Sequence, residues 1–308
     1  MMTPHRFSRR SELGREIRVS FEFFPPRNAA VAETLSATLA RLDSLRPDFC
    51  SVTYGAGGST REPTREALRK IIAETGMPAT SHMTCVDASR DDVDAVAREF
   101  AAMGVRRFLA LRGDPAAGVG ARYEPHPGGY ANGAELVAGL KAIDAGFDIS
   151  VAAYPEKHPE SRDFATDIDM LKRKVDNGAA RAITQFCFDN DVHEAYIERV
   201  RRAGIYIPIV PGILPIHNFR QVTNFASRCG AHIPAWLQDR FDGLTGDMRT
   251  HQLVAAAVAA EQVMDLVERG VRDFHFYTMN QPDLVFAICH MIGIRPAEQE
   301  PVENGLAA

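Results

Sequence analysis

The sequence predicts an α/β fold of the (β/α)8 (TIM) barrel type, in which parallel strands alternate with helices. Short β-rich runs alternate with longer helical patterns, the alternation repeats eight times, and the 308 residues can hold a barrel of about 250 residues. The predicted strands are 17–24, 48–54, 79–84, 106–111, 148–153, 181–186, 206–210 and 273–277. The predicted helices lie near 31–45, 61–75, 90–103, 132–145, 164–177, 192–203, 218–229 and 250–269.

A doubly wound open sheet is the alternative arrangement for the same alternation. That fold usually carries a GxGxxG fingerprint after its first strand, and the sequence contains no such motif there. We therefore predict one barrel domain at 17–295. The segments 1–16 and 296–308 are expected to be flexible ends.

The composition excludes several functional classes. Net charge is −5, from 35 basic and 40 acidic residues, so the basic excess of a nucleic-acid-binding protein is absent. No run approaches the ~18 apolar residues of a membrane span, and the N-terminus lacks the apolar core of a secretory signal. The five cysteines are scattered without CxxC spacing, which predicts free thiols, no metal site and a cytoplasmic location.

Polar or aromatic side chains stand at the ends of the predicted strands. In chain order the strands run into "FEFFPPR", "SVTYGAGG", "SHMTC", "LALRGDP", "VAAYPEKHPES", "AITQFCFD", "PGILPIHNFRQ" and "HFYTMNQ". A barrel of this type builds its active site at the carboxyl ends of its strands, so the shared position predicts a site. The candidates are Glu22, Thr53, Tyr54, His82, Arg112, Asp114, Tyr154, His158 and Gln185.

Glu22 is the most unusual candidate. It lies in "VSFEFFPPR" beside Phe21, Phe23 and Phe24, where removing a carboxylate from water is costly. We expect the phenylalanine side chains to surround the carboxyl group and to disfavour its charged form. The alternative is a structural ion pair between Glu22 and an arginine.

Other candidates have ordinary structural explanations as well. The "RGDP" around Asp114 is a common turn sequence, and His82 could be a core histidine bonded to a backbone carbonyl. The "LKRK" at 171–174 could be a solvated helix face. Residues 112–131 and 230–249 form irregular connections, and Gly/Pro-rich loops as long as the first are often functional.

Several longer motifs resemble one family. "VSFEFFPPR", "SVTYGA", "ALRGD", "DISVAAYPEKHPES", "LKRKVDNGA", "AITQFCFD", "VPGILPI", "IPAW" and "DFHFYT" occur in the order found in 5,10-methylenetetrahydrofolate reductases of the bacterial, flavin-containing type. The resemblance runs from about residue 17 to 295. It implies a (β/α)8 barrel that binds FAD and passes hydride from a reduced pyridine nucleotide to flavin and then to folate.

The resemblance also implies roles for single residues. Glu22 is the proton donor that opens the five-membered ring of the substrate, and Asp114 is the carboxylate beside the flavin that stabilises the cationic iminium. The implied cofactor contacts are Thr53, Tyr54, Ala56, His82, Arg112, Gly113, Asp114, Tyr130, Ala131, Ala152, Tyr154, His158, Asp167, Arg173 and Lys174. The implied substrate contacts are Asp114, Gln185, Gln221, Phe225 and Gln281.

The sequence departs from the family pattern at two of these places. Gln281 stands where the family often has an arginine near the folate glutamate tail, and Met170 replaces a polar residue that often contacts the cofactor. We expect NADH, or else NADPH, as co-substrate in a ping-pong cycle, and a homo-oligomer. The alternatives are a flavin-independent folate reductase of the same fold and a non-catalytic barrel that binds folate or flavin.

Overall fold

The parallel strands close into a ring, in a computed structural model that describes residues 16–115 and 123–296. They pair in the order β7-β6-β5-β4-β3-β2-β1-β9-β8. The strands are β1 (Arg18–Phe23), β2 (Phe49–Val52), β3 (Ala79–Thr84), β4 (Arg107–Leu111), β5 (Asp148–Ala153), β6 (Arg181–Thr184), β7 (Ile209–Val210), β8 (Gly212–Ile213) and β9 (Asp273–Tyr277). The predicted end segments 1–16 and 296–308 lie outside the described residues, except for Glu16 and Pro296.

The seventh barrel strand is split into two short pieces. Pro211 separates β7, which pairs with β6, from β8, which pairs with β9. Proline has no N–H to give to a neighbouring strand, so the regular ladder stops there. The predicted strand 206–210 was therefore wrong at both ends, since pairing begins at Ile209 and continues to Ile213. The ring as a whole confirms the predicted (β/α)8 barrel.

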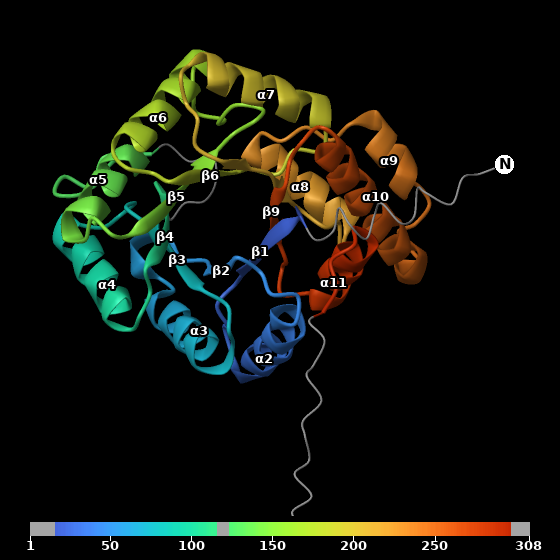
Figure 1. Cartoon of the computed structure of the whole chain (residues 1–308), viewed down its shortest axis with the longest axis horizontal. Helices are drawn as coiled ribbons and strands as arrows, with labels where there is room; N and C mark the ends of the chain where they lie inside the picture. Colours follow the sequence, from blue (N-terminus) through green and yellow to red (C-terminus); the bar gives the residue numbers. More distant parts are fainter. Residues whose placement is uncertain (1–15, 116–122, 297–308) are drawn as a thin grey trace, which may run out of the picture.

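Helices surround the ring on its outside, as Figure 1 shows. They are α2 (Ala29–Asp43), α3 (Arg61–Glu74), α4 (Arg90–Ala102), α5 (Gly133–Ile143), α6 (Phe164–Asp176), α7 (Asn190–Arg202), α8 (Phe219–Cys229), α9 (Ala235–Phe241), α10 (Met248–Glu268) and α11 (Pro282–Met291), with a short 3₁₀ turn η1 (Ala56–Gly58). Two helices were not predicted. Helix α9 lies within the expected irregular segment 230–249, and α11, which begins with Pro282 as a first-turn residue, follows the last strand.

The alternation of side chains along β1 places Glu22 inside the barrel. Phe21 and Phe23 are fully buried in the large core between the sheet and the helices, together with Leu35 and Leu39 of α2. Successive residues of a strand face opposite sides of the sheet. Glu22 therefore points away from these two phenylalanines, and the expected phenylalanine wall around its carboxyl group was wrong.

A smaller apolar cluster fills the inside of the ring. It consists of Phe49, Leu109, Ile183 and Val210, from strands β2, β4, β6 and β7. Such layers of inward-facing side chains make the interior of this fold a packed core. The site must therefore lie at an end of the barrel and not along its axis.

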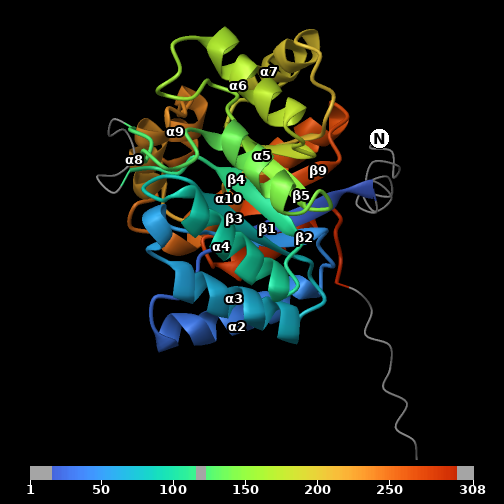
Figure 2. The same ribbon diagram turned by 90° about the vertical axis from the view of Figure 1, so that its left-hand side faces the viewer.

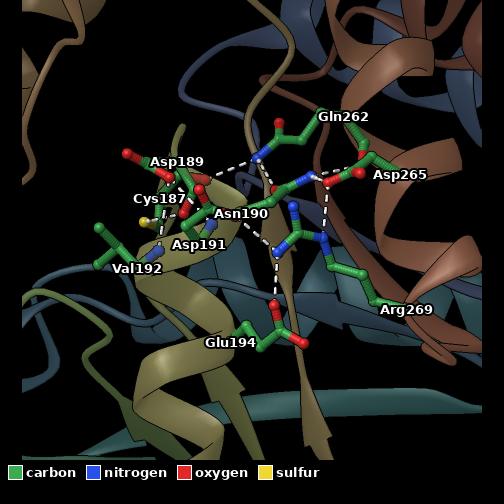
Figure 3. A network of polar contacts seen from close by, with 9 residues as sticks. All are labelled: Cys187, Asp189, Asn190, Asp191, Val192, Glu194, Gln262, Asp265 and Arg269. Carbon is green, nitrogen blue, oxygen red and sulfur yellow. Dashed lines mark hydrogen bonds and ion pairs between the residues drawn. The ribbon is translucent and has the colours of Figure 1, made fainter.

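A polar network fixes the loop between β6 and α7 to α10 (Figure 3). Asn190 Nδ2 donates to Gln262 O at 3.0 Å, and Gln262 Nε2 donates to Cys187 O at 2.6 Å. Arg269 adds ion pairs to Asp191, Glu194 and Asp265 at 2.7, 2.6 and 2.9 Å. These contacts hold the loop that follows the last residues of β6 in one position.

Two predictions from composition can be compared with the structure. None of the helices in 16–115 and 123–296 is long and apolar enough to cross a membrane. The cysteines Cys50, Cys85, Cys187, Cys229 and Cys289 are all buried and free.

Candidate active site

Glu22 lies near the carboxyl end of β1 and faces two histidines inside the barrel. Its Oε2 lies 3.4 Å from His82 Nε2 and 3.9 Å from His275 Nε2, and its side chain is only 12% exposed. His82 Nε2 also lies 3.2 Å from Ser51 Oγ. Burial lowers the pKa of His82 to about 4 although Glu22 opposes that shift, so the imidazole is neutral at neutral pH. No arginine pairs with Glu22 in the part of the chain that the structure describes.

His275 belongs to this cluster and was not predicted from the sequence. It is fully buried in the interior of β9, and its Nδ1 lies 2.7 Å from Ser20 Oγ. A signal was present in "DFHFYT", where His275 alternates with Phe274 and Phe276 and so faces the opposite side of the strand. Only the pairing of β1 with β9, which puts Ser20 opposite His275, shows what it faces.

A cavity of about 750 Å³ opens beside β4, β5 and α6. Its volume is within the range of small-molecule sites, about 300–1,000 Å³. Most of the predicted cofactor contacts line it, namely Arg112, Gly113, Asp114, Ala152, Tyr154, His158, Asp167, Arg173 and Lys174. Residues from three separate stretches of sequence therefore meet in one cavity.

Lys174 is a buried cation in the wall of this cavity. It is 9% exposed, and its Nζ donates to Ala152 O at 2.9 Å. Burial lowers its pKa to about 8, and Asp167 opposes that shift. Asp167 accepts a hydrogen bond from Ser161 Oγ at 2.9 Å, and burial raises its pKa. The "LKRK" stretch is thus not simply a solvated helix face.

Arg112 is held by Glu160, a residue that we did not single out from the sequence. Its Nη1 and Nη2 contact the two carboxylate oxygens of Glu160 at 2.6 and 2.9 Å. This two-point geometry ties the end of β4 to the loop between β5 and α6. Asp114 is farther from Arg112, at 4.0 Å, and is about half exposed. Partial desolvation raises the pKa of Asp114, while Arg112 opposes that shift.

Position 113 can hold only glycine, for two reasons. Its φ is +83°, and a Cβ there would lie 2.5 Å from Val86 Cγ1 and 2.9 Å from Thr84 Cβ. Both the backbone conformation and the lack of space exclude a side chain. The "RGD" segment therefore approaches the loop after β3 closely.

His158 and Tyr154 pack against each other in the wall of the cavity. Their rings meet edge to face with centroids 4.7 Å apart. Burial, followed by the nearby Arg112, lowers the pKa of His158 to about 4, and its Nδ1 accepts from Glu160 N at 3.1 Å. His158 is therefore a neutral ring at neutral pH.

The remaining predicted cofactor contacts do not line this cavity. They are Thr53, Tyr54, Ala56, His82, Tyr130 and Ala131. Tyr54 borders a second, smaller cavity near η1. Tyr130 donates its hydroxyl to Asp94 at 2.8 Å and packs against Gly139 of α5.

Three of the predicted substrate contacts, Gln185, Gln221 and Phe225, lie after β6 or on α8. Gln185 follows β6, and its Oε1 accepts from Phe186 N at 3.1 Å. The Phe186 ring lies 5.6 Å from that of Phe225 on α8, and Gln221 precedes Phe225 by four residues. In Figure 2 the chain enters β1 on the right and α8 lies on the left, at the opposite end of the barrel. Gln281 is exposed at the start of α11.

No cluster of three or more His, Cys, Asp or Glu side chains that could hold a metal ion occurs within residues 16–115 and 123–296.

Comparisons with known proteins identify the family of the chain. A family model described as "Methylenetetrahydrofolate reductase" matches residues 6–293. The 5,10-methylenetetrahydrofolate reductases of Salmonella typhimurium and Escherichia coli are each 46% identical to this chain over 286 residues, which is 93% of this chain and 94% of either relative. "Methylenetetrahydrofolate reductase (NADH) 1" of Zea mays is 30% identical, and the chain spans about half of that relative, 51%.

A solved structure supports the fold. An uncharacterised protein from Clostridium thermocellum, which binds two copies of 5-methyl-5,6,7,8-tetrahydrofolic acid, matches with a TM-score of 0.62 at 12% identity. The match covers 92% of this chain and 96% of that one. The sequence-based predictions of a barrel and of an enzyme are confirmed, and the chain belongs to the methylenetetrahydrofolate reductase family.

Proposed function

We propose that this enzyme reduces 5,10-methylenetetrahydrofolate to 5-methyltetrahydrofolate with electrons from NADH or NADPH, using FAD held in the large cavity. The reduction of methylenetetrahydrofolate is the reaction of its family. The observation that supports FAD as the cofactor is the cavity beside β4, β5 and α6, which gathers candidate residues from three separate segments. When bound, FAD would supply the hydride chemistry.

The donor set of the cavity suits an anionic, elongated ligand. Lys174 is buried in its wall, and Arg173 and Arg112 line it as well. The N-terminus of α5 reaches it through Asn132 and Gly133. Cations and a helix N-terminus are the groups that bind a diphosphate in proteins. We therefore assign the diphosphate of FAD to the part of the cavity lined by these groups, with Lys174 and Arg173 as its partners.

Glu22 would deliver the proton that the reaction needs. Its carboxyl group protonates one nitrogen of the five-membered ring of the substrate, the carbon–nitrogen bond opens, and a cationic iminium remains. The half-exposed carboxylate of Asp114 would stabilise that cation. Gln185 and Phe225, which meet through Phe186, would orient the folate.

Separate measurement of the two half-reactions tests the proposal. In anaerobic stopped-flow with the flavin-loaded enzyme, NADH or NADPH should bleach the flavin absorbance, and methylenetetrahydrofolate should restore it. Glu22→Gln should keep the first step and slow the second by about 10²–10⁴-fold, the usual contribution of a general acid. If both steps survive in Glu22→Gln, the assigned proton donor is wrong.

The same sample decides between the proposal and its alternatives. A purified protein that is colourless and transfers hydride directly from the nucleotide would be a flavin-independent reductase. Absence of turnover with either nucleotide would favour a binding barrel. We also propose a homo-oligomeric state, which light scattering tests, and a cytoplasmic location.

A further inference from the structure

His275 is held rigidly beneath Glu22. The Phe49 ring stacks on it at 5.7 Å with a 20° interplanar angle, and the Tyr277 ring meets it edge-on at 5.5 Å. Ser20 Oγ lies 2.7 Å from its Nδ1. With one face stacked, an aromatic ring in edge contact and one nitrogen bonded, the orientation of the imidazole is restricted.

The Ser20 hydroxyl selects the tautomer of this histidine. Ser20 Oγ lies 3.3 Å from Phe274 O, which can only accept, and 2.7 Å from His275 Nδ1, a contact that fits either direction. With its single proton directed to Phe274 O, Ser20 would accept a hydrogen bond from His275. His275 Nδ1 then carries the ring proton, and Nε2 carries a lone pair.

The other nitrogen of the ring lacks a partner. His275 Nε2 is buried and has no hydrogen-bond partner among the residues that the structure describes. The carboxyl oxygen that faces it is Glu22 Oε2, at 3.9 Å. His193 Nε2, His217 Nε2 and His251 Nδ1 are unpartnered as well, so the feature that distinguishes His275 is the Glu22 carboxyl group facing its free nitrogen.

We propose that Ser20 fixes the tautomer of His275 so that His275 accepts a hydrogen bond from Glu22 and holds that carboxyl group in its protonated form. The inference rests on the proposed role of Glu22 as proton donor. A lone pair facing a carboxylate repels it, whereas a lone pair facing a protonated carboxyl group is a hydrogen-bond acceptor. A movement of Glu22 by about 1 Å would bring the two atoms to bonding distance. His275 is thus a positioning residue that acts through Glu22.

The other titratable and charged groups around the cluster are consistent with this arrangement. His82 on β3 is neutral at neutral pH because burial lowers its pKa to about 4. Burial raises the pKa of Tyr277 well above its ordinary value, so it is neutral as well. Arg107 and Arg181 lie 5.7 and 5.5 Å from the centre of the Phe49 ring, which packs against His275.

Ser20→Ala is the most direct test, because it removes the hydroxyl that selects the tautomer and little else. Without it, His275 can present Nε2–H to Glu22 and favour the carboxylate. We expect the basic limb of the pH profile of the folate half-reaction to move to lower pH by about one unit, the size of one hydrogen bond. Flavin reduction by the nucleotide should keep its rate and pH profile.

Substitution of the histidine gives a second route if Ser20→Ala folds poorly. A glutamine amide extends to the position of Nε2, whereas an asparagine amide extends only to that of Nδ1. His275→Asn should slow the folate half-reaction by about tenfold, the effect of one lost hydrogen bond, and His275→Gln by less. Histidine ¹⁵N NMR of the purified protein gives a readout independent of activity, and should show an Nδ1–H tautomer for His275 that changes in Ser20→Ala.

His193 provides a matched control. It is also buried with an unpartnered Nε2, but it lies on α7 outside the barrel. His193→Gln should leave both half-reactions and their pH profiles unchanged. If Ser20→Ala and His275→Asn also keep the wild-type profile while Glu22→Gln loses the folate step, this inference is overturned and the proposed function stands. If Glu22→Gln keeps the folate step, the proposed function fails first.

Discussion

The two ends of the barrel use their charged residues in different ways. At the end where the strands begin, charges pair with each other. Arg18 of β1 lies 2.6 Å from Asp273 of β9, and Asp148 of β5 lies 3.1 Å from Arg181 of β6 and 3.7 Å from Arg107.

Toward the end where the strands finish, Arg112 and Glu160 also pair, but two buried groups, Lys174 and His275, have fewer partners. Lys174 is buried beside a cavity and donates to the backbone carbonyl of Ala152, and His275 Nε2 has no hydrogen-bond partner among the described residues. Holding a charge or a lone pair in such a place costs stability. The comparison indicates that the first end serves folding and the second serves chemistry, as is general for this fold.

The largest expected effect is the loss of flavin binding on removing the buried cation. Lys174→Met keeps the length of the side chain but removes its charge, and a charge-assisted bond to phosphate contributes about 1.5–3 kcal/mol. The dissociation constant of FAD should rise by about ten- to a hundredfold in fluorescence titration. Lys172→Met is the control, because Lys172 lies on the same helix, pairs with Asp176 at 3.4 Å and does not line the cavity. Equal losses in both variants would contradict a specific role for Lys174.

The same lysine should make stability depend on pH. Its pKa of about 8 in the folded protein lies below the ordinary 10.5 of the unfolded chain, so burying its charge costs stability in full below pH 8. Between pH 8 and 10.5 the folded form loses the proton first, and the cost, on the order of 3 kcal/mol, is relieved. Urea unfolding of the flavin-free protein should therefore show the wild type gaining stability with pH in this window, relative to Lys174→Met. Parallel curves for the two proteins would contradict the buried charge.

A change at the opposite end should reduce stability and leave catalysis intact. Arg181→Met removes the nearer partner of Asp148, whose other partner, Arg107, lies at 3.7 Å. Because both side chains are about a quarter exposed, we expect a loss of about 1–2 kcal/mol in the free energy of unfolding. The rate constants of both half-reactions should match those of the wild type. A fall in these rates without a loss of stability would remove the distinction between the two ends.

The barrel was predicted from local periodicity, and the part of the cavity wall at the strand ends from the shared position of its residues, whereas Lys174 was implied by the family resemblance. Strand and helix periodicity gave the repeating unit, and the motifs that contain Arg112, Asp114 and Lys174 lie at the ends of consecutive strands or on the helix that follows. These segments are neighbours in the ring because consecutive strands of this fold are neighbours.

The sequence did not predict the surroundings of Glu22, because these depend on pairing between distant strands. Ser20 and His275, which are 255 positions apart in the sequence, meet only through the pairing of β1 with β9. The phenylalanines beside Glu22 in the sequence face the other side of the sheet, so adjacency along the chain was misleading. Glu160 was overlooked because its partner, Arg112, comes from a different strand end.

The smallest expected effect concerns the departure from the family at Gln281. This residue is exposed at the start of α11, at the end of the barrel where β9 finishes. Gln281→Arg would add a cation that a folate carrying several glutamates can reach, and an exposed ion pair contributes about 0.2–1 kcal/mol. The KM for a polyglutamylated folate should fall by about two- to fivefold, and that for the monoglutamate by less. Raising the salt concentration should abolish the gain, because exposed pairs are screened. A gain that is equal for both folates would show that position 281 does not contact the tail, and that this end of the barrel binds the tail through another cation.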